Sequence, residues 1–515
     1  MKNILIAIRS IFKKGRHNVM KIVSLGIGLA VGLVLIAKVY FEQSYDDFYP
    51  DRDRVYQVWA KYQQNGGELK DYPQTSGGIA PTMQQQIPEI ETVTRYTSFG
   101  DWTFTMTDTK MKYSGRCIIA DSCFFDILPR PMLIGNAKEV LSTPMYVLVS
   151  SRIAKNIGGD VIGKNFTVDS SPGRTMTIGG VFEEVPENSH SRYDVIVSMA
   201  SAGRFMWEGS PTNMLGNDRY ISYVKLHKGV NPLALEEQVH TFVNSYFPPE
   251  EQQKTGFNIG FSFHELDGLH KELPQVKRMT WILSLLAFAL IFTAVMNYIL
   301  IVISSIVNRS KEVAVHKCYG ASENNIHGMM FGEALVHIVL SLILALLLIL
   351  AFRGTVEELL ATSLDSLLLS NGSLVLLGIC ILVFFVSGFM PGSLYARIPV
   401  ASAFRNYREN KRIWKKALLL VQFVATGFLV TMLVFVARQY TFMVNDRPGY
   451  AYENLAYCGL AGVDSTSRAK ILDEVMRLPG VVAATTVYLS SMLPVIIFFY
   501  RVRLKSFLIS PISIG

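Results

Sequence analysis

The chain has 515 residues, of which 50% are hydrophobic and 17% are charged, and its formal net charge is +8 at pH 7. Its lysines and arginines cluster in short segments that flank long apolar runs. This placement attributes the charge to membrane topology and attraction to anionic lipid, so nucleic acid is not needed as a partner. An ordinary soluble protein is excluded.

Five apolar runs are each about as long as the ~20 residues that a helix needs to cross the core of a bilayer. They carry almost no charge, which makes a set of buried helices in a soluble domain a poor alternative. We predict a polytopic α-helical membrane protein with five spans. The predicted spans are 22–41, 279–307, 328–352, 373–395 and 417–437.

Lysine and arginine lie mostly on one side of these spans. The flanks 1–21, 305–327 and 396–416 hold sixteen of them, whereas the opposing short loop 353–372 holds only Arg353. The positive-inside rule therefore places the N-terminus in the cytoplasm. No small-residue cleavage pattern follows the first run, which favours an uncleaved anchor over a signal peptide.

Two features of the first run bear on its packing. Lys38 lies near its outer end, where its side chain can snorkel to the membrane interface. Gly28 and Gly32 form a GxxxG pattern, which is typical of close helix packing, although glycine is also common in ordinary spans.

The segment 42–278 is polar and rich in turns, with alternating runs that predict strands. We expect a mixed α/β extracytoplasmic domain, large enough for one core or two lobes. Within it, Cys117 and Cys123 either form a disulfide or remain as two free buried thiols. Predicted strands are 54–62, 145–149, 165–168, 174–178, 193–197 and 220–226, and predicted helices are 80–86, 151–157 and 232–246.

Two patterns in this domain imitate catalytic motifs. The run 158–165 has Asn165 where a phosphate-binding loop needs a Ser or Thr hydroxyl for magnesium, so we interpret it as a glycine-rich turn. His264 and Glu265 are followed by His270, but a zinc-binding helix needs histidines four residues apart. We predict no metal site, no bound cofactor and no catalytic residue in the chain.

Three polar residues stand out within the spans. Glu333 and His337 are four residues apart and share one helix face, close to the inner surface. Either they pack and hydrogen-bond within the bundle, or they handle a proton or substrate. Asn297 in the second span is expected to join two helices by a hydrogen bond.

The segment 308–322 joins the second and third spans and combines basic and apolar residues. Gly320 is suited to end a short helix, and Ser322 is suited to cap the next one. We interpret the segment as a rigid cytoplasmic docking element that would transmit a push from a partner. The alternative is a positively charged inside loop that binds no partner.

The same segment resembles the coupling segment of the MacB/FtsX family of ABC transporter permeases. The family pattern is Arg-x-Lys-Glu-x-x-x-Arg-Lys-x-x-Gly-Ala-Ser, and His316 stands here where arginine is usual, while Glu333 also matches a family acid. The outer domain resembles the MacB-type domain in runs 121–125, 135–136, 151–155, 162–164 and 180–190. Residues at the pattern positions are Arg309, Lys311, Glu312, His316, Lys317, Gly320, Ala321 and Ser322.

This resemblance implies a permease of the bacterial inner membrane that couples ATP hydrolysis to movement of its extracytoplasmic domain. A separate cytoplasmic ABC ATPase dimer would bind ATP and magnesium. Further implied partners are the lipid bilayer, a second permease copy or half, and a periplasmic adaptor or outer-membrane protein. Efflux or envelope export is the expected role; alternatives are activation of a cell-wall hydrolase and extraction of lipoproteins.

The segment 396–416 and the fifth span, 417–437, repeat the plan of the basic N-terminus and the first span. This order indicates an internal duplication. Residues 438–515 are then the beginning of a second outer domain, and from about Val495 we interpret them as an atypical tail of a truncated second half. The other expected divisions are 1–21 cytoplasmic and 279–395 FtsX-like.

Overall fold

The computed structural model describes residues 18–169, 171–216, 218–369, 372–396, 413–445, 455–460, 465–489 and 493–500. The chain divides into two compact units. We call them the helical unit, which comprises Met1–Pro50, Glu187–His190 and Asp267–Gln439, and the sheet unit, which comprises Asp51–Pro186, Ser191–Leu266 and Tyr440–Gly515. Most of the basic N-terminus and of the linker 396–416 lies outside the described residues.

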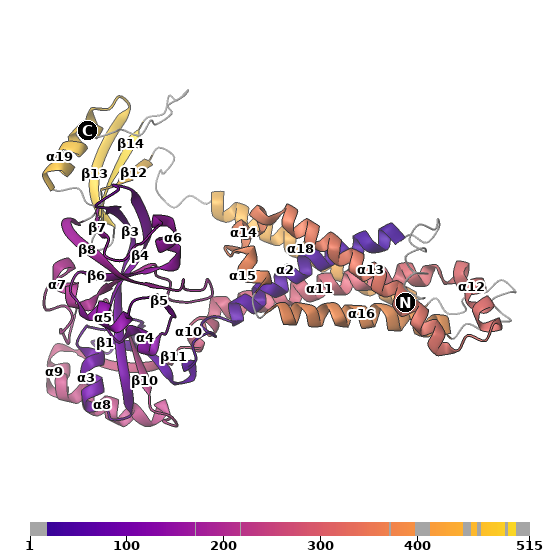
Figure 1. Ribbon diagram of the computed structural model, residues 1–515, viewed down its shortest axis with the longest axis horizontal. Helices are drawn as coiled ribbons and strands as arrows, with labels where there is room; N and C mark the ends of the chain where they lie inside the picture. The colour runs from indigo at the N-terminus through magenta and orange to yellow at the C-terminus, as the bar shows by residue number, and fades with distance from the viewer. Residues whose placement is uncertain are drawn as a thin grey trace. The chain divides into compact units, whose positions relative to one another are not determined.

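The described residues contain five helices long and apolar enough to cross a membrane, which confirms the predicted fold class. The first begins several residues before the predicted span, and the second ends earlier because a separate helix starts at Ile306. The five helices are α2 (Asn18–Gln43), α11 (Pro274–Ser304), α13 (Glu323–Ala351), α16 (Ser373–Ala396) and α18 (Ile413–Asn445) (Figure 1).

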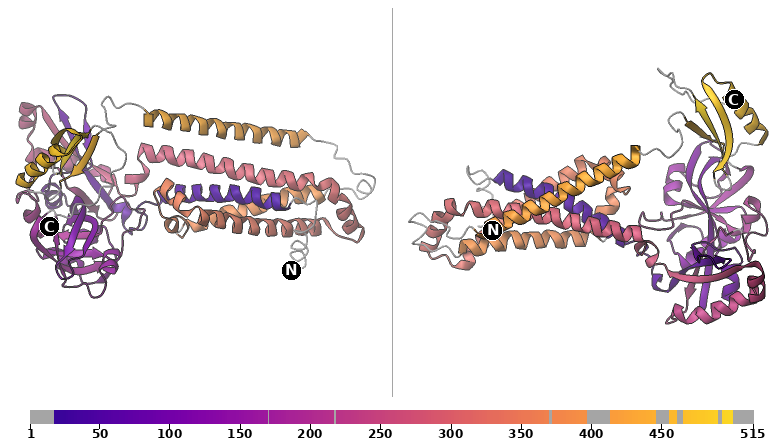
Figure 2. Two further views of the ribbon diagram at one scale, coloured as in Figure 1. Left: turned by 90° about the horizontal axis from the view of Figure 1, so that it is seen from above. Right: turned by 180° about the vertical axis from the view of Figure 1, so that it is seen from behind.

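Helix α2 packs closely against its neighbours through glycine. A Cβ atom at Gly28 would overlap Ala294, and one at Gly32 would overlap Ile291, so both glycines bring α2 against α11. A Cβ atom at Gly26 would crowd α13 in the same way. Because lipid tails are as apolar as leucine, such close packing holds spanning helices together better than hydrophobicity does. The GxxxG pattern therefore marks a real contact, and α2 lies beside α11 and α13 in Figure 2.

Short helices occupy both ends of the bundle. The outer loop between α13 and α16 forms α14 (Arg353–Leu360) and α15 (Leu364–Leu368), which the sequence analysis left without structure. At the other end of α13, α12 (Ile306–Cys318) follows α11. The short helix α10 (Gly268–Lys271) directly precedes α11 in the chain.

The sheet unit is built on an eleven-stranded mixed sheet, in the order β11-β1-β10-β3-β4-β9-β6-β8-β5, with β2 paired to β1 and β7 paired to β3 and β8. The pairs β4–β9 and β6–β8 are parallel, and the other pairs are antiparallel. Strand bounds are β1 Val55–Gln64, β2 Lys70–Tyr72, β3 Ile90–Met106, β4 Lys112–Ala120, β5 Met132–Ile134, β6 Tyr146–Ser150, β7 Asn165–Val168, β8 Ser171–Phe182, β9 Val195–Ser198, β10 Ile221–Leu226 and β11 Phe257–Glu265.

The long strand β3 serves two separate hydrophobic cores, which gives the domain two lobes. Its first half contributes Ile90 and Val93 to a core with β1, β10 and the helices α3 (Ile79–Gln86) and α8 (Glu236–Tyr246). Its second half contributes Trp102 and Phe104 to a core with β6, β7 and β9. Other helices are α4 Phe124–Ile127, α5 Ala137–Ser142, α6 Ser151–Ile157, α7 Ala202–Phe205 and α9 Pro249–Thr255, and the 3₁₀ turns are η1 Arg52–Arg54 and η2 Met199–Ser201.

The sequence analysis located six strands and three helices of this unit, with small shifts in their bounds. The predicted helix 232–246 differs, because its first turn is the 3₁₀ helix η3 (Pro232–Leu235) and α8 begins only at Glu236. Strands β2, β3, β4, β5 and β11 were missed. In β3 and β4, polar residues and glycine interrupt the alternation on which strand prediction depends; β2 and β5 have only three residues each, and β11 was missed although its apolar and polar residues alternate.

The structure also decides the smaller alternatives. Cys117 and Cys123 are both free, and Cys117 is buried. Gly158 and Gly163 have positive φ and form the turn that precedes β7, as the glycine-rich interpretation requires. His264 lies on β11 in the sheet unit and stacks on Trp59, whereas His270 belongs to the helical unit.

Beyond α18, the described residues form a three-stranded sheet in the order β12-β14-β13. Strand β14 pairs with both of its neighbours through residues that we interpreted as part of an atypical tail. An apolar run too short to span a membrane is long enough for a central strand, and the interpretation of this segment as an atypical tail stays a prediction. The elements are β12 Leu455–Gly459, α19 Ser465–Arg477, β13 Val481–Leu489 and β14 Leu493–Tyr500.

Candidate functional site

The predicted docking segment forms a helix, a tight turn and a second helix. Helix α12 ends where Gly320 adopts a φ of 85°, a conformation that costs glycine little. The Gly320 amide donates to the Lys317 carbonyl (3.0 Å) and the Ala321 amide to the His316 carbonyl (3.0 Å), the pair of bonds of a Schellman cap. The Ser322 hydroxyl accepts a bond from the backbone amide of Asn325 (3.4 Å) and so caps the start of α13.

Helix α12 is fixed to the inner end of the bundle by its apolar face. Val313 and Ala314 are each only 1% exposed and belong to the same core cluster as Ile326 of α13 and Tyr395 of α16. The Tyr395 hydroxyl donates to the Val302 carbonyl (3.1 Å), at the point where α11 gives way to α12. A displacement of α12 would therefore move α11, α13 and α16 together, because interiors packed this closely transmit strain.

The opposite face of α12 is accessible. Lys311 and His316 are exposed, Glu312 and Lys317 are half-buried, and Arg309 lies in the first turns of the helix. The sequence analysis missed Tyr319, which is 89% exposed directly before the Gly320 turn. A large exposed aromatic side chain at a turn is typical of an interface anchor, and its position inside the quoted pattern was the signal that could have revealed it.

Within the bundle, each of the three predicted polar residues has a partner on another helix. The Asn297 amide donates to the Ser24 hydroxyl (2.6 Å), and Tyr298 and His337 share a hydrogen bond (3.2 Å). Glu333 lies 3.5 Å from the ammonium of Lys21. These bonds join α2, α11 and α13, as the hydrogen-bonding interpretation requires.

Lys21 has a different position from the one we expected. It was counted among the basic residues of a cytoplasmic flank, 1–21, but α2 already begins at Asn18 and Lys21 is fully buried. Its ammonium also donates to the Asn18 side chain (3.3 Å). Removing an ion pair this deep from water is costly, so its two charges depend on each other.

A second ionic cluster lies at the outer end of α2. Lys38 does not snorkel outward; it is buried, forms an ion pair with Glu42 (2.7 Å) and donates to the Thr362 hydroxyl (2.8 Å). Glu42 also accepts a bond from His270 (2.6 Å), and the ring of Tyr45 stacks on His270 with centroids 3.5 Å apart. The outer ends of α2 and α10 and the loop before α15 are thereby joined.

The segment Glu187–His190, which we call the clasp segment, is bound next to this cluster. Asp46 is fully buried, accepts a bond from the Ser189 hydroxyl (2.8 Å) and lies 2.7 Å from Nδ1 of His190. The Asp46 amide donates to the Asn188 carbonyl (2.9 Å). Glu187 accepts a bond from the Ser363 backbone amide (3.0 Å), so the clasp segment is bonded both to the turn that follows α2 and to the outer loop.

The position of the clasp segment in the chain matters. It belongs to the helical unit, yet the chain enters it from β8 and leaves it toward β9, which are strands of the sheet unit. The clasp segment thus connects the turn after α2 with the chain between two strands of the large sheet. The sequence analysis quoted these residues only as part of a run that resembles the MacB-type domain.

Comparisons with known proteins agree with this architecture. Residues 20–242 match the MacB-like periplasmic core domain, and residues 284–400 match the FtsX-like permease C-terminal domain. A crystal structure of a domain described as belonging to a permease protein from Porphyromonas gingivalis is 32% identical in sequence, covers 42% of this chain and 91% of that one, and superposes with a TM-score of 0.39. No curated protein matches. The chain belongs to the MacB/FtsX family of ABC permeases, multi-pass membrane proteins with a periplasmic-type domain.

Proposed function

We propose that the chain is a permease subunit whose helical bundle transmits force from a separate cytoplasmic ABC ATPase dimer to the extracytoplasmic domain. The observation that carries this proposal is α12 with its Gly320 turn: one face is buried against α13 and α16, and the other presents Tyr319, Lys311 and His316. ATP and magnesium would be bound by the ATPase, and this chain would supply no catalytic residue.

The route of the force follows the contacts of the helical unit. A push on α12 reaches α11, α13 and α16 through the shared apolar core. The bonds of Asn297, His337 and Glu333 extend it to α2. At the outer end, Asp46 passes it to the clasp segment and so to the chain between β8 and β9.

We further propose that this movement drives export of a substrate across the cell envelope. The polar residues Asn297, Glu333 and His337 bond helices to one another, which favours force transmission over a polar substrate path through the bundle. A second permease copy or half would complete the membrane assembly, and a periplasmic adaptor or outer-membrane protein would receive the substrate.

The docking assignment can be tested by co-purification with the ATPase. Tyr319→Ala removes the exposed ring without touching the buried face of α12, and the pair Glu312→Ala with Lys317→Ala removes the two half-buried charges. We expect each of the two variants to lower the amount of ATPase recovered by about tenfold. For Tyr319→Ala, the reason is that loss of an aromatic anchor costs roughly 1 to 2 kcal/mol or more. Unchanged recovery in both variants would refute the assignment.

Leu359→Ala is the matched control. Leu359 is also an exposed apolar residue (78%), but it lies on α14, beyond the opposite end of α13. We expect its substitution to leave ATPase recovery unchanged. An equal loss in this control would mean that the assay reports the condition of the bundle and not docking at α12.

A further inference from the structure

One face of the sheet continues past its helical cover. On β1, Val58 is fully buried in the core beneath α3 and α8 and Ala60 is also fully buried, and Tyr62 and Gln64 follow on the same face because side chains alternate along a strand. The register of β1 with β2 and β11 places Lys70 and Tyr72, and Phe257 opposite Gln64, on this face as well. Phe242 of α8 covers Phe261, but these residues lie beyond it.

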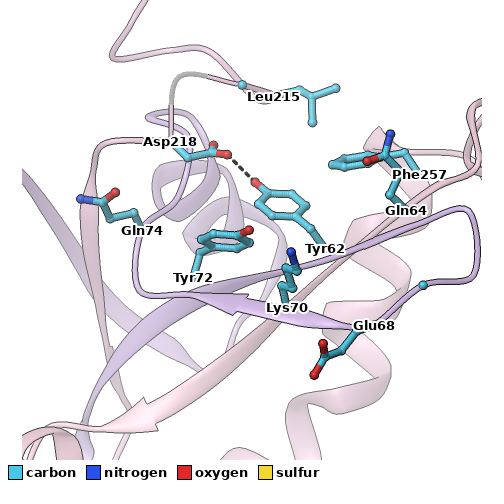
Figure 3. A pocket seen from close by; sticks show the side chains of 11 residues that line it. Tyr62, Gln64, Glu68, Lys70, Tyr72, Gln74, Leu215, Asp218 and Phe257 are labelled. Carbon is cyan, nitrogen blue, oxygen red and sulfur yellow. Dashed lines mark hydrogen bonds between the residues drawn. The ribbon is translucent and has the colours of Figure 1, made fainter. Parts of the chain in front are cut away.

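The uncovered part of this face forms the floor of an open cavity of about 870 Å³ (Figure 3). Three neighbouring rings, which we call the platform, line it: Tyr62 and Phe257 have centroids 5.2 Å apart and planes inclined by 26°, and Tyr72 lies 5.6 Å from Tyr62 with its plane inclined by 51°. Leu215 and Asp218, from the loop before β10, line the cavity across from the strands. The volume lies within the ~300 to 1,000 Å³ that is usual for small-ligand sites.

The central ring is held in place. The Tyr62 hydroxyl donates to Asp218 (2.7 Å), and Ser76 donates to the other oxygen of the same carboxylate. Burial, together with the hydrogen bond and charge of Asp218, raises the pKa of Tyr62 far above its ordinary value, so the phenol keeps its proton. The ring is therefore a fixed surface, and a ligand that packs on it loses little affinity to ordering of the protein.

We propose that this platform, formed by Tyr62, Tyr72 and Phe257, binds a short, neutral oligosaccharide. One face of a sugar ring presents C–H groups, which pack on an aromatic face, while its hydroxyls both donate and accept hydrogen bonds. The rim matches this demand. Gln64 and Gln74 provide amides that donate and accept, Lys70 provides donors and Glu68 provides acceptors.

The charges around the cavity argue against an ionic ligand. An organic cation on the rings would face the ammonium of Lys70, and a phosphate would face the carboxylates of Glu68 and Asp218. Asp218 is already engaged by two hydroxyl donors. Opposite charges on one rim favour a ligand without net charge. The site is independent of the coupling proposed above, because all its residues belong to the sheet unit.

The test is a binding measurement on the full chain in phospholipid nanodiscs. Detergents with maltose headgroups must be absent, since they carry the proposed ligand chemistry. The probes are maltotriose and triacetylchitotriose, followed by saturation-transfer NMR and calorimetry. We expect at least one probe to bind, and we expect Tyr62→Ala and Tyr72→Ala each to weaken that binding by about tenfold, equivalent to about 1.4 kcal/mol. Tyr62→Phe, which keeps the ring, should retain affinity to within about threefold.

Trp207→Ala is the control, because Trp207 is another exposed aromatic residue (64%) of the sheet unit that does not line the cavity. It should bind the probes like the unmodified chain. Three results would overturn the proposal: neither probe binds, binding survives both alanine substitutions in folded protein, or tetramethylammonium or a neutral tripeptide binds more tightly with the same dependence on Tyr62.

Discussion

The inner and outer ends of the bundle differ in what they leave exposed. At the inner end, α12 presents an aromatic side chain and charged groups on its free face. At the outer end, Lys38, Glu42 and Asp46 are buried and bonded to other parts of the helical unit. An accessible surface suits a partner that binds and leaves, whereas a closed set of ionic bonds suits a permanent connection. The two ends therefore correspond to input and output of the proposed force.

If this comparison holds, the largest loss of stability should come from the ion pair within the bundle. Lys21→Met removes the ammonium that lies 3.5 Å from the buried Glu333 carboxylate, and we expect this change to destabilise the folded bundle by about 3 to 5 kcal/mol. Thermal unfolding of the full chain in nanodiscs measures the effect. A loss of this size would mean that the helices of the bundle unfold together and can act as one rigid unit between its two ends.

The double variant Lys21→Met with Glu333→Leu is the control, since it removes both charges and keeps apolar volume. It should recover most of the lost stability, because apolar replacement of a buried ion pair is often neutral. A single Lys21→Met variant as stable as the unmodified chain would show that Glu333 does not depend on Lys21.

A second experiment separates the two ends. Asp46→Ala removes the acceptor of Ser189 and His190, and each bond to a buried charge contributes about 1.5 to 3 kcal/mol. We expect the amides of the clasp segment to exchange with deuterium about thirtyfold faster, equivalent to about 2 kcal/mol of local opening energy. Co-purification of the ATPase should be unaffected, in contrast to Tyr319→Ala.

Asp47→Ala is the matched neighbour, because Asp47 is the next residue along the chain and is bonded to Lys271 (2.9 Å) of α10. Its exchange pattern at residues 187–190 should resemble that of the unmodified chain. Equal acceleration in both variants would mean that Asp46 has no special part in holding this segment, and the distinction between an open inner end and a closed outer end would fail.

The two ends also differ in how far sequence reasoning reached. The inner turn depends on Gly320 and Ser322, whose conformational preferences are local, so its geometry could be predicted. The outer cluster depends on pairs such as Asp46 with His190, which are 144 residues apart and have no local pattern. Lys21 shows the same limit, because a lysine near a helix start predicts an inside flank unless its distant acid is known.

The strands of the sheet unit were predictable where they are mostly apolar and β-branched, as in β6 and β9, and not where polar residues occupy many positions, as in β3. Strand β3 contains Thr94, Arg95 and Thr97 on buried positions, where it lies between β10 and β4, and the Arg95 side chain is bonded there to Asp121. The cavity at Tyr62 could not be foreseen either. It depends on where α8 stops covering the sheet, which only the packing decides.

The smallest effect is expected from an ion pair outside the bundle, which provides a baseline for the buried ones. Asp51 of the sheet unit bonds to Lys225 (2.5 Å) and Arg54 (3.0 Å), and these bonds lower the pKa of its carboxyl below its ordinary value of 3.8, although burial opposes them. A carboxyl whose pKa is lowered by folding contributes stability above its unfolded pKa and loses it as the pH falls through the folded pKa. Because the Asp51 side chain is 37% exposed, we expect Asp51→Asn to cost at most about 1 kcal/mol at pH 7.

The difference in unfolding free energy between Asp51→Asn and the unmodified chain should shrink as the pH falls below about 4. The effect of Lys21→Met at pH 7 should be several times larger. Unfolding of the full chain at both pH values, at low and at high salt, measures this. If Asp51→Asn lowered the unfolding free energy as much as Lys21→Met, burial could not explain why the ion pair in the bundle contributes to stability.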